Sequence, residues 1–258
     1  MPTAHNGGVS LYYESTGVGD DAVVFVGDVG FGAWQWAWQH RAVAGPFRTV
    51  VFDHRGVGRS DTPPGPYSIP TLAADVEAVL ADVGVSRAHL VGAGLGGLVA
   101  LAFAHESGRV RSLTLLGCGL GDPTPLEAFA PTDDTAALRT STESLLSDDF
   151  VREQPAVVDR IVEWRAAEDA PRSVWRAHTA AVDGFEPPPL YEVTTPALVV
   201  HGRADDRWPV DGARALAADL PRGDFHSLAD AQHLVGVERS RVVNDRLVGH
   251  IESVSGST

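Results

Sequence analysis

The residues around Gly94 have the spacing of a turn that presents a catalytic nucleophile, but the nucleophile itself is missing. Small and apolar residues at 88–91 predict a buried strand, and residues 98–104 predict a helix soon after it. A sharp turn from strand to helix, with glycine on both sides of one residue, is the nucleophile elbow G-x-S-x-G. Gly92 and Gly96 fit this pattern, so Gly94 stands where serine, cysteine or aspartate would attack a substrate. Covalent catalysis from this position is therefore excluded.

Five segments of the chain, taken in order, resemble the motifs of the α/β-hydrolase family. They are a third strand with its oxyanion loop at 23–36, a D-x-R-G-x-G-x-S-D loop at 52–61, the elbow at 91–97, a strand ending in an acid at 198–205 and a histidine loop at 231–233. The resemblance implies an α/β fold, with a mostly parallel central sheet flanked by helices and an inserted helical lid. It also implies an enzyme.

The same resemblance assigns two residues of a catalytic triad. His233 matches the family's general base and Asp205 the acid that orients it. Such an acid holds the imidazole in one tautomer and stabilises it when it is charged. Asp206 is adjacent and is an alternative acid, although the register of the motif favours Asp205. An ordinary loop histidine is the alternative interpretation of His233.

A second departure from the family lies at the end of the third strand, where Gly27-Asp28 replaces the usual His-Gly. Backbone N–H groups of this loop normally help to bind the oxyanion of a tetrahedral intermediate. An ionised Asp28 at ~4 Å would repel that oxyanion by about 4 kcal/mol at an effective dielectric of ~20. This is roughly a thousandfold in rate. Alternatively, Asp28 caps the helix expected over residues 34–39.

The combined loss of nucleophile and His-Gly predicts a non-hydrolytic, cofactor-independent enzyme. His233 would be its general base, Asp205 the orienting acid and Asp28 a second proton carrier or polar anchor in the pocket left open by Gly94. Proton transfer of this kind suits isomerisation, cyclisation, elimination or carbon–carbon bond formation on a small, aromatic or polyketide-like metabolite, as in specialised metabolism. Some nucleophile-free members of the family work in this way.

Two alternatives stay open. The first is a hydrolase of an ester, lactone or epoxide that uses water activated by His233. The second is a non-catalytic ligand-binding pseudoenzyme, in which Gly94 merely relaxes a strained elbow.

The residues expected to line a substrate pocket come from the oxyanion loop, the elbow, a strand end and the lid. They are Gly27, Val29, Trp34, Leu95, Cys118, Trp175 and His178. Cys118 follows a strand and is either a displaced nucleophile or, more simply, a small buried apolar residue. Trp175 and His178 lie three apart on one helical face and could contact an aromatic substrate, or simply pack the lid. Arg55 and Asp61 are expected to brace their loop.

Alternating apolar runs and helical patterns predict the sheet and its covering helices. The pattern changes at residues 121–123 and returns at 196–200, between two expected sheet strands. We therefore expect a hydrolase core at 1–121 and 190–258, and a helical lid at 122–189. Within the lid, residues 147–165 and 173–182 are each expected to form one amphipathic helix.

The composition limits the partners of the protein. Its 258 residues suffice for one catalytic domain with a lid, and the net charge of −14 argues against nucleic acid or an anionic membrane surface. A single cysteine, with neither a signal-peptide pattern nor a long apolar run, predicts a cytoplasmic protein. No cofactor is expected, and no metal-ligand spacing is found in the sequence. The substrate is expected to be a small molecule. Monomer and homodimer both remain open.

Overall fold

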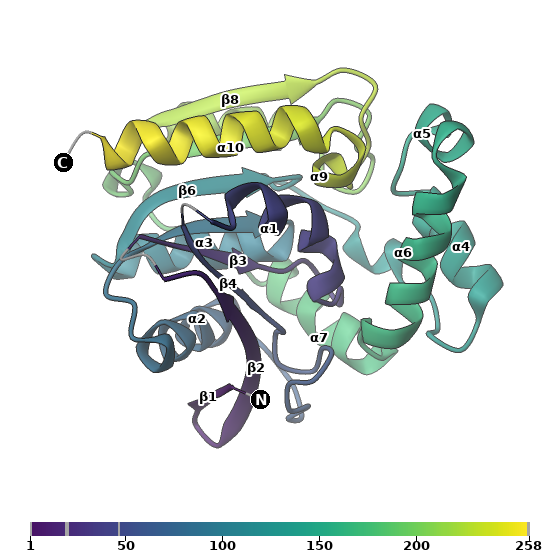
Figure 1. The fold of residues 1–258 in the computed structure, drawn as a ribbon, viewed down its shortest axis with the longest axis horizontal. Helices are drawn as coiled ribbons and strands as arrows, with labels where there is room; N and C mark the ends of the chain where they lie inside the picture. Colours follow the sequence, from purple (N-terminus) through teal and green to yellow (C-terminus); the bar gives the residue numbers. More distant parts are fainter. Residues whose placement is uncertain (1, 19–20, 46, 257–258) are drawn as a thin grey trace.

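The computed structural model describes residues 2–18, 21–45 and 47–256, which build a sheet covered by helices on both faces (Figure 1). The strands are β1 Thr3–Asn6, β2 Val9–Thr16, β3 Ala22–Val26, β4 Arg48–Phe52, β5 Ala88–Ala93, β6 Val110–Leu116, β7 Ala197–Gly202 and β8 Gly223–Leu228. Their order in the sheet is β1-β2-β4-β3-β5-β6-β7-β8. β2 pairs in the antiparallel sense with both β1 and β4. The strands that follow β4 in this order, from β3 to β8, are parallel to it and to one another. The predicted fold class is confirmed.

Apolar residues on both faces of the central strands explain why helices cover both faces of the sheet. In β3, Val23 and Phe25 pack into one apolar cluster, whereas Val24 and Val26 pack into the other. The helices of the first face are α1 Ala37–Val43 and α10 Ser240–Ser255. Those of the second face are α2 Ile69–Val83, α3 Leu95–Glu106 and α8 Val210–Asp219. Because helices cover both faces of the parallel sheet, a functional site is expected at the carboxyl ends of its strands.

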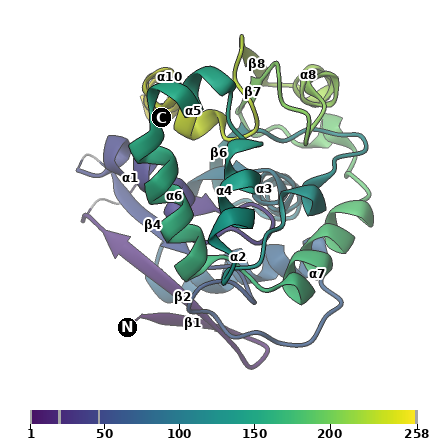
Figure 2. The same ribbon diagram turned by 90° about the vertical axis from the view of Figure 1, so that its right-hand side faces the viewer.

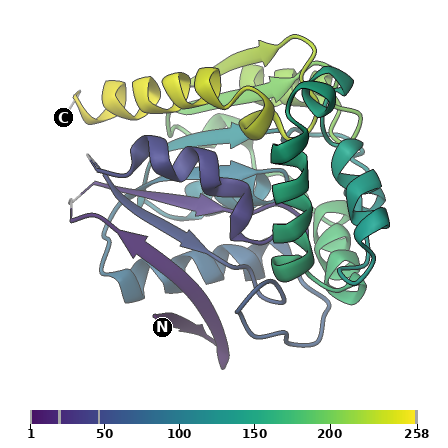
Figure 3. The same cartoon turned by 45° about the vertical axis from the view of Figure 1, so that its right-hand side comes forward.

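A helical insertion follows β6 and lies at the carboxyl ends of the parallel strands (Figures 2 and 3). Its helices are α4 Thr135–Glu143, α5 Asp148–Glu153, α6 Pro155–Glu168 and α7 Arg172–Asp183, with a short turn of 3-10 helix, η2, at Pro125–Ala128. Two more short turns, η1 at Ala33–Trp36 and η3 at Leu190–Glu192, and the single-turn helix α9 at Val235–Glu238 complete the described elements. The sequence predicts a helical insertion between two sheet strands, and these helices lie between β6 and β7.

The single helix expected at residues 147–165 is wrong. The chain instead breaks at Gln154, and Pro155 begins a new helix. Proline has no N–H to donate and its ring clashes with the preceding turn, so it belongs at a helix start. The apolar period continued across the break and concealed it.

Two loop residues brace their surroundings, as the sequence predicted. Arg55 makes two hydrogen bonds to the Asp75 carboxylate on α2, at 2.7 and 2.6 Å. Asp61 accepts a hydrogen bond from the Ser10 backbone N–H at 2.8 Å. The Asp75 side chain has no exposed surface, so Arg55 is its chief source of compensating charge.

Replacing Asp75 by alanine is expected to destabilise the protein by about 3–5 kcal/mol, because the Arg55 guanidinium would remain buried without its partner. Urea unfolding monitored by circular dichroism measures this change. Glu252→Ala, on the exposed side of α10, is the matched helix control and should shift stability by less than ~0.5 kcal/mol. Equal effects of the two variants would contradict this account of the loop.

Candidate active site

The elbow has the geometry predicted from its glycines. Gly94 links β5 to α3 with φ +45° and ψ −114°, and its N–H donates to the Leu116 carbonyl at 3.1 Å. Gly96 lies so close to β3 that a Cβ there would meet the Val26 carbonyl oxygen at 2.0 Å. The tight turn therefore requires glycine beside it, and the backbone at residue 94 is in the region that disfavours side chains.

The Asp28 carboxylate fills the space beside Gly94. A Cβ on Gly94 would lie 2.0 Å from Asp28 Oδ1 and 2.2 Å from its Cγ. Asp28 Oδ1 accepts hydrogen bonds from the N–H groups of Val29, at 2.6 Å, and Leu95, at 2.9 Å. These two donors come from the oxyanion loop and from the residue after the elbow position, which are the family's oxyanion donors. An aspartate on β3's loop thus occupies the oxyanion site itself, not merely its neighbourhood.

The alternative in which Asp28 caps the following helix is not what the structure shows. Neither η1 nor α1 has a side-chain cap at its start. The Asp28 side chain turns toward the elbow instead, and it is only 3% exposed. Gln35 helps to fix this loop, because its Oε1 accepts a hydrogen bond from the Asp28 backbone N–H at 3.2 Å.

His233 joins Asp28 to Asp205. Its Nε2 lies 2.8 Å from Asp28 Oδ2, and its Nδ1 lies 2.9 Å from Asp205 Oδ2. Asp205 follows β7 and is held in place by backbone N–H groups of Arg207, at 2.8 Å, and Trp208, at 3.0 Å. Asp206 is exposed and its carboxylate lies 3.5 Å from the Arg207 guanidinium, so Asp205 is the carboxylate beside His233. We call Asp28, His233 and Asp205 the carboxylate–imidazole chain.

Both ring nitrogens of His233 face carboxylate oxygens, an arrangement in which an imidazolium donates one hydrogen bond to each carboxylate. Burial by itself lowers the pKa of His233, but the charges and hydrogen bonds of Asp205 and Asp28 outweigh burial and raise it to about 10. Burial likewise raises the pKa of Asp205, but the His233 charge and hydrogen bond outweigh it and hold that pKa below its usual value. At neutral pH the chain thus holds a proton between two carboxylates.

A small cavity adjoins the carboxylate–imidazole chain. Asp28 and His233 line it together with Leu116 and Val235, and its volume is about 30 Å³. A polar cavity needs ~10–15 Å³ to hold one water molecule. The space beside these two side chains is therefore large enough for a water molecule, and it would have to widen to admit an organic substrate.

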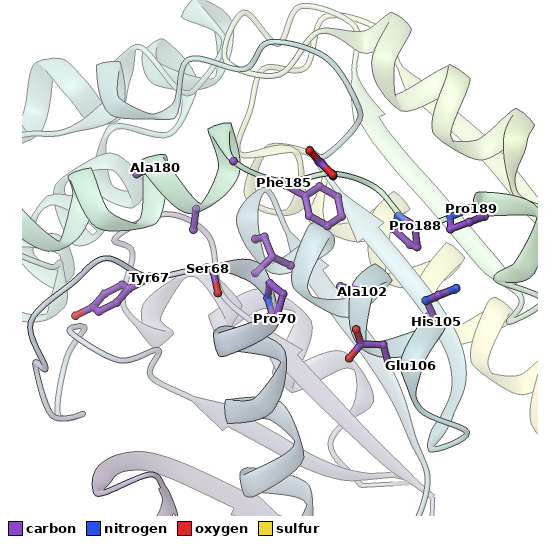
Figure 4. A pocket seen from close by; sticks show the side chains of 14 residues that line it. Tyr67, Ser68, Pro70, Ala102, His105, Glu106, Ala180, Phe185, Pro188 and Pro189 are labelled. Atoms are coloured by element: carbon purple, nitrogen blue, oxygen red, sulfur yellow. The ribbon is translucent and has the colours of Figure 1, made fainter.

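A larger cavity of about 450 Å³ lies between α7 and the beginning of α2, beside α3 (Figure 4). Tyr67, Pro70, Ala102 and Phe185 are among the side chains that line it. No residue of the carboxylate–imidazole chain lines it. Its size suits a small organic molecule.

The predicted lid residues Trp175 and His178 pack onto the oxyanion loop. The Gly30 N–H donates to His178 Nδ1 at 3.2 Å, and a Cβ on Gly30 would meet the Trp175 ring at 2.2 Å. Burial lowers the pKa of His178 to about 3, so this ring is neutral. Neither side chain lines the 30 Å³ or the 450 Å³ cavity. In this structure they position the loop that carries Asp28.

Two other residues predicted to line a substrate pocket, Trp34 and Cys118, lie away from the carboxylate–imidazole chain's cavity. Trp34 donates through Nε1 to the lid carboxylate of Asp169 at 2.9 Å, and it lines a separate cavity of about 260 Å³. Cys118 has no exposed surface, and burial raises the pKa of its thiol well above its usual range. Its Sγ packs against Gly97 of α3. These contacts agree with Cys118 as a small buried residue.

Sequence reasoning assigned no role to two buried histidines near the site. His54 donates from Nε2 to the Gly27 carbonyl at 3.0 Å and so supports the oxyanion loop. His201 Nε2 lies 3.6 Å from Asp205 Oδ2. Both residues lie at the carboxyl ends of parallel strands, where ligands bind in open α/β sheets. That position in the sequence could have indicated a role for them near the site. Within residues 2–18, 21–45 and 47–256, His, Cys, Asp and Glu side chains form no group that could hold a metal ion.

Of the helices in the described part of the chain, none is both long and apolar enough to cross a membrane.

Comparison with known proteins places these observations in a family. The sequence model of the alpha/beta hydrolase family matches residues 23–246. A 2-hydroxy-6-oxononadienedioate/2-hydroxy-6-oxononatrienedioate hydrolase of Burkholderia vietnamiensis is 31% identical, with 91% of this chain and 88% of the relative covered. A putative carbamate hydrolase, RutD, of Caulobacter segnis is 29% identical, with 91% and 92% covered. The enol-lactonase from Burkholderia xenovorans has a similar structure, with a TM-score of 0.86 at 25% identity over 97% of this chain and 99% of that one.

The prediction of a non-hydrolytic enzyme of specialised metabolism, such as a lyase, isomerase or cyclase, is wrong. These relatives are named as hydrolases, and their likeness extends over most of the chain. That prediction rested on two independent losses, of the nucleophile at Gly94 and of the His-Gly pair at Gly27-Asp28. The structure shows that they compensate in space, because the Asp28 carboxylate occupies the volume that Gly94 leaves free. With its matched motifs, its sheet order and its relatives, this chain belongs to the alpha/beta hydrolase family.

Proposed function

We propose that this protein hydrolyses a small-molecule ester, lactone or epoxide with water that the carboxylate–imidazole chain activates. The observation that carries the proposal is the contact of His233 with both carboxylates, at 2.8 and 2.9 Å, beside a cavity of about 30 Å³. Relatives named for the hydrolysis of a carbamate, a dienedioate and an enol-lactone support it.

The protonation of the chain sets the order of proton transfers. His233 begins as an imidazolium, so it first gives its Nε2 proton to the departing oxygen of the substrate while the oxygen of water bonds to the reacting carbon. The neutral ring then accepts a proton from water as a general base. Asp205 keeps the ring oriented in both steps and stabilises its charged form. The resting protein is therefore prepared to act first as an acid and then as a base.

The test is turnover of a panel of p-nitrophenyl esters, γ-lactones and styrene oxide. His233→Ala is expected to lower kcat/KM at least ~10³-fold, because proton transfer to and from the ring is lost. His226→Ala, a partly exposed histidine of β8, is the matched control and should stay near wild-type activity. Turnover that survives His233→Ala would contradict the proposal, as would ligand binding without turnover of any substrate.

Three further expectations from the sequence remain proposals. The lid is taken to extend over residues 122–189, the substrate to be a small molecule that needs no cofactor, and the protein to act in the cytoplasm. The charge of −14 and the single cysteine support the last two. Size-exclusion chromatography would distinguish a monomer from a homodimer.

A further inference from the structure

We propose that Asp28 has replaced the missing elbow nucleophile, so that its Oδ2 attacks an epoxide carbon while its Oδ1 lies in the oxyanion hole. This inference rests on the proposed hydrolytic function and narrows it to one substrate class. It also gives the Asp28 carboxylate a covalent role, in place of proton transfer.

The first argument is the position of the carboxylate. A Cβ built on Gly94 would lie within 2.0–2.4 Å of Asp28 Oδ1, Cγ and Oδ2, so these three atoms occupy the space of a side chain at residue 94. Oδ2 also lies 2.8 Å from His233 Nε2, which is hydrogen-bonding distance between a nucleophile and its histidine. A nucleophilic oxygen is thus present beside the elbow, although it comes from β3's loop.

The second argument is the position of the other oxygen. Oδ1 accepts two backbone hydrogen bonds, from Val29 at 2.6 Å and Leu95 at 2.9 Å. If Asp28 is esterified through Oδ2, Oδ1 becomes the carbonyl oxygen of that ester and already lies in the oxyanion hole. Attack of water on Cγ would then place the developing charge on an oxygen with two preorganised donors.

The same contacts disfavour a carbonyl substrate. An ester or lactone needs these two N–H groups for its own oxyanion, and Asp28 Oδ1 occupies both. A carboxylate instead displaces a leaving group from a saturated carbon and forms an ester. Among such electrophiles an epoxide suits the site, because ring opening produces an alkoxide that the adjacent His233 imidazolium can protonate. A halide would leave as an anion into a site that already has two carboxylates and one imidazolium.

The reaction balances with water as the only co-reactant. In the first step an Oδ2 electron pair forms the bond to the epoxide carbon, the ring C–O bond breaks, and the alkoxide takes the Nε2 proton of His233. In the second step water gives a proton to His233 and attacks Cγ. The tetrahedral intermediate collapses by breaking its bond to the alkyl oxygen, which takes the proton of the new carboxyl group. The products are a diol, the Asp28 carboxylate and the His233 imidazolium.

Esterification also switches the role of His233. Asp28 contributes both charge and a hydrogen bond to the raised pKa of this ring. The ester of Asp28 has no charge, so the ring loses this part of its stabilisation just when a general base is needed. Water in the adjacent cavity of about 30 Å³ would lie beside both the ring and Asp28.

The experiment follows oxygen-18 during turnover of styrene oxide by the wild-type enzyme in oxygen-18 water. Repeated turnover is expected to place the heavy isotope in the peptide that contains Asp28, whereas the diol from the first turnover takes its oxygen from unlabelled enzyme. His233→Gln lacks the base of the second step, so the Asp28 ester, formed more slowly with water protonating the alkoxide, should accumulate, and intact-protein mass spectrometry detects it. Asp28→Asn should lower turnover at least ~10³-fold, whereas Asp206→Asn, an exposed carboxylate, should not.

The outcomes separate this inference from the proposed function. Heavy oxygen in the first-turnover diol with an unlabelled Asp28 would overturn the inference and leave a hydrolase that uses water directly. Turnover of esters or lactones but not of epoxides would do the same. Hydrolysis of no member of the panel would overturn both.

Discussion

Gly94→Ser is expected to destabilise the protein by about 1–3 kcal/mol, because its side chain must enter space that Asp28 already fills. The Cβ alone would lie 2.0 Å from Asp28 Oδ1, and residue 94 has φ +45°. Thermal or urea unfolding measures the change. The single variant should also have no new esterase activity, because Asp28 still occupies the oxyanion hole.

The double variant Asp28→Gly/Gly94→Ser is expected to recover part of that stability and to gain serine esterase activity. Removing the carboxylate frees the N–H groups of Val29 and Leu95 for a substrate oxyanion and leaves His233 beside the new hydroxyl. We expect p-nitrophenyl ester turnover about 10² times that of either single variant, the size of effect that one oxyanion donor has.

The matched control is Asp28→Gly/Gly94→Ala, which makes the same space without a nucleophile. It should be as stable as the serine double variant and lack its activity. If Gly94→Ser alone were as stable as the wild type, or if the two substitutions were additive, Asp28 and residue 94 would not share one volume.

The second large effect concerns the proton on His233. The ring is expected to titrate at about pH 10 in the wild type and substantially lower in Asp28→Asn, because one of its two carboxylates is then neutral. Long-range proton–nitrogen NMR correlation of the histidine rings measures this directly. At pH ~7 both wild-type ring nitrogens should have the shifts of a protonated imidazole.

The same shift predicts a stability profile. A pKa raised from 6.5 to about 10 on folding contributes stability that is complete below pH 6.5 and is lost as pH rises through about 10. The unfolding free energy should therefore fall between about pH 7 and pH 10, and it should fall less in Asp28→Asn. Equal slopes in the two proteins would show that Asp28 does not hold the proton on His233.

Much of the fold could be predicted because its signals are local. Apolar strands, alternating with helical patterns, fixed the parallel sheet, and the glycines around residue 94 predicted the elbow. The break at Pro155 was missed although proline marks it, because the apolar period on either side outweighed one residue. Asp205 and His233 were predicted from motifs, and in the structure His233 Nδ1 lies 2.9 Å from Asp205 Oδ2.

The direction of the Asp28 side chain could not be predicted in the same way. It depends on space left by a glycine far along the chain and on N–H groups from two separate loops. The sequence predicts that Asp28 shares a pocket with His233 only if the Asp28 side chain points toward Gly94 and does not cap the following helix. Trp175 and His178 depended likewise on tertiary contact, because their approach to Gly30 has no local signal.

A double-mutant cycle on Asp28 and His233 tests most directly whether the carboxylate–imidazole chain works as one catalytic unit. The kcat/KM of wild type, Asp28→Asn, His233→Gln and the double variant should be measured on the best substrate of the panel. We expect each single variant to lose at least ~10³-fold and the double variant to lose little more than either, since residues that act as a unit are non-additive. Losses that multiply, or full activity in either single variant, would contradict the account.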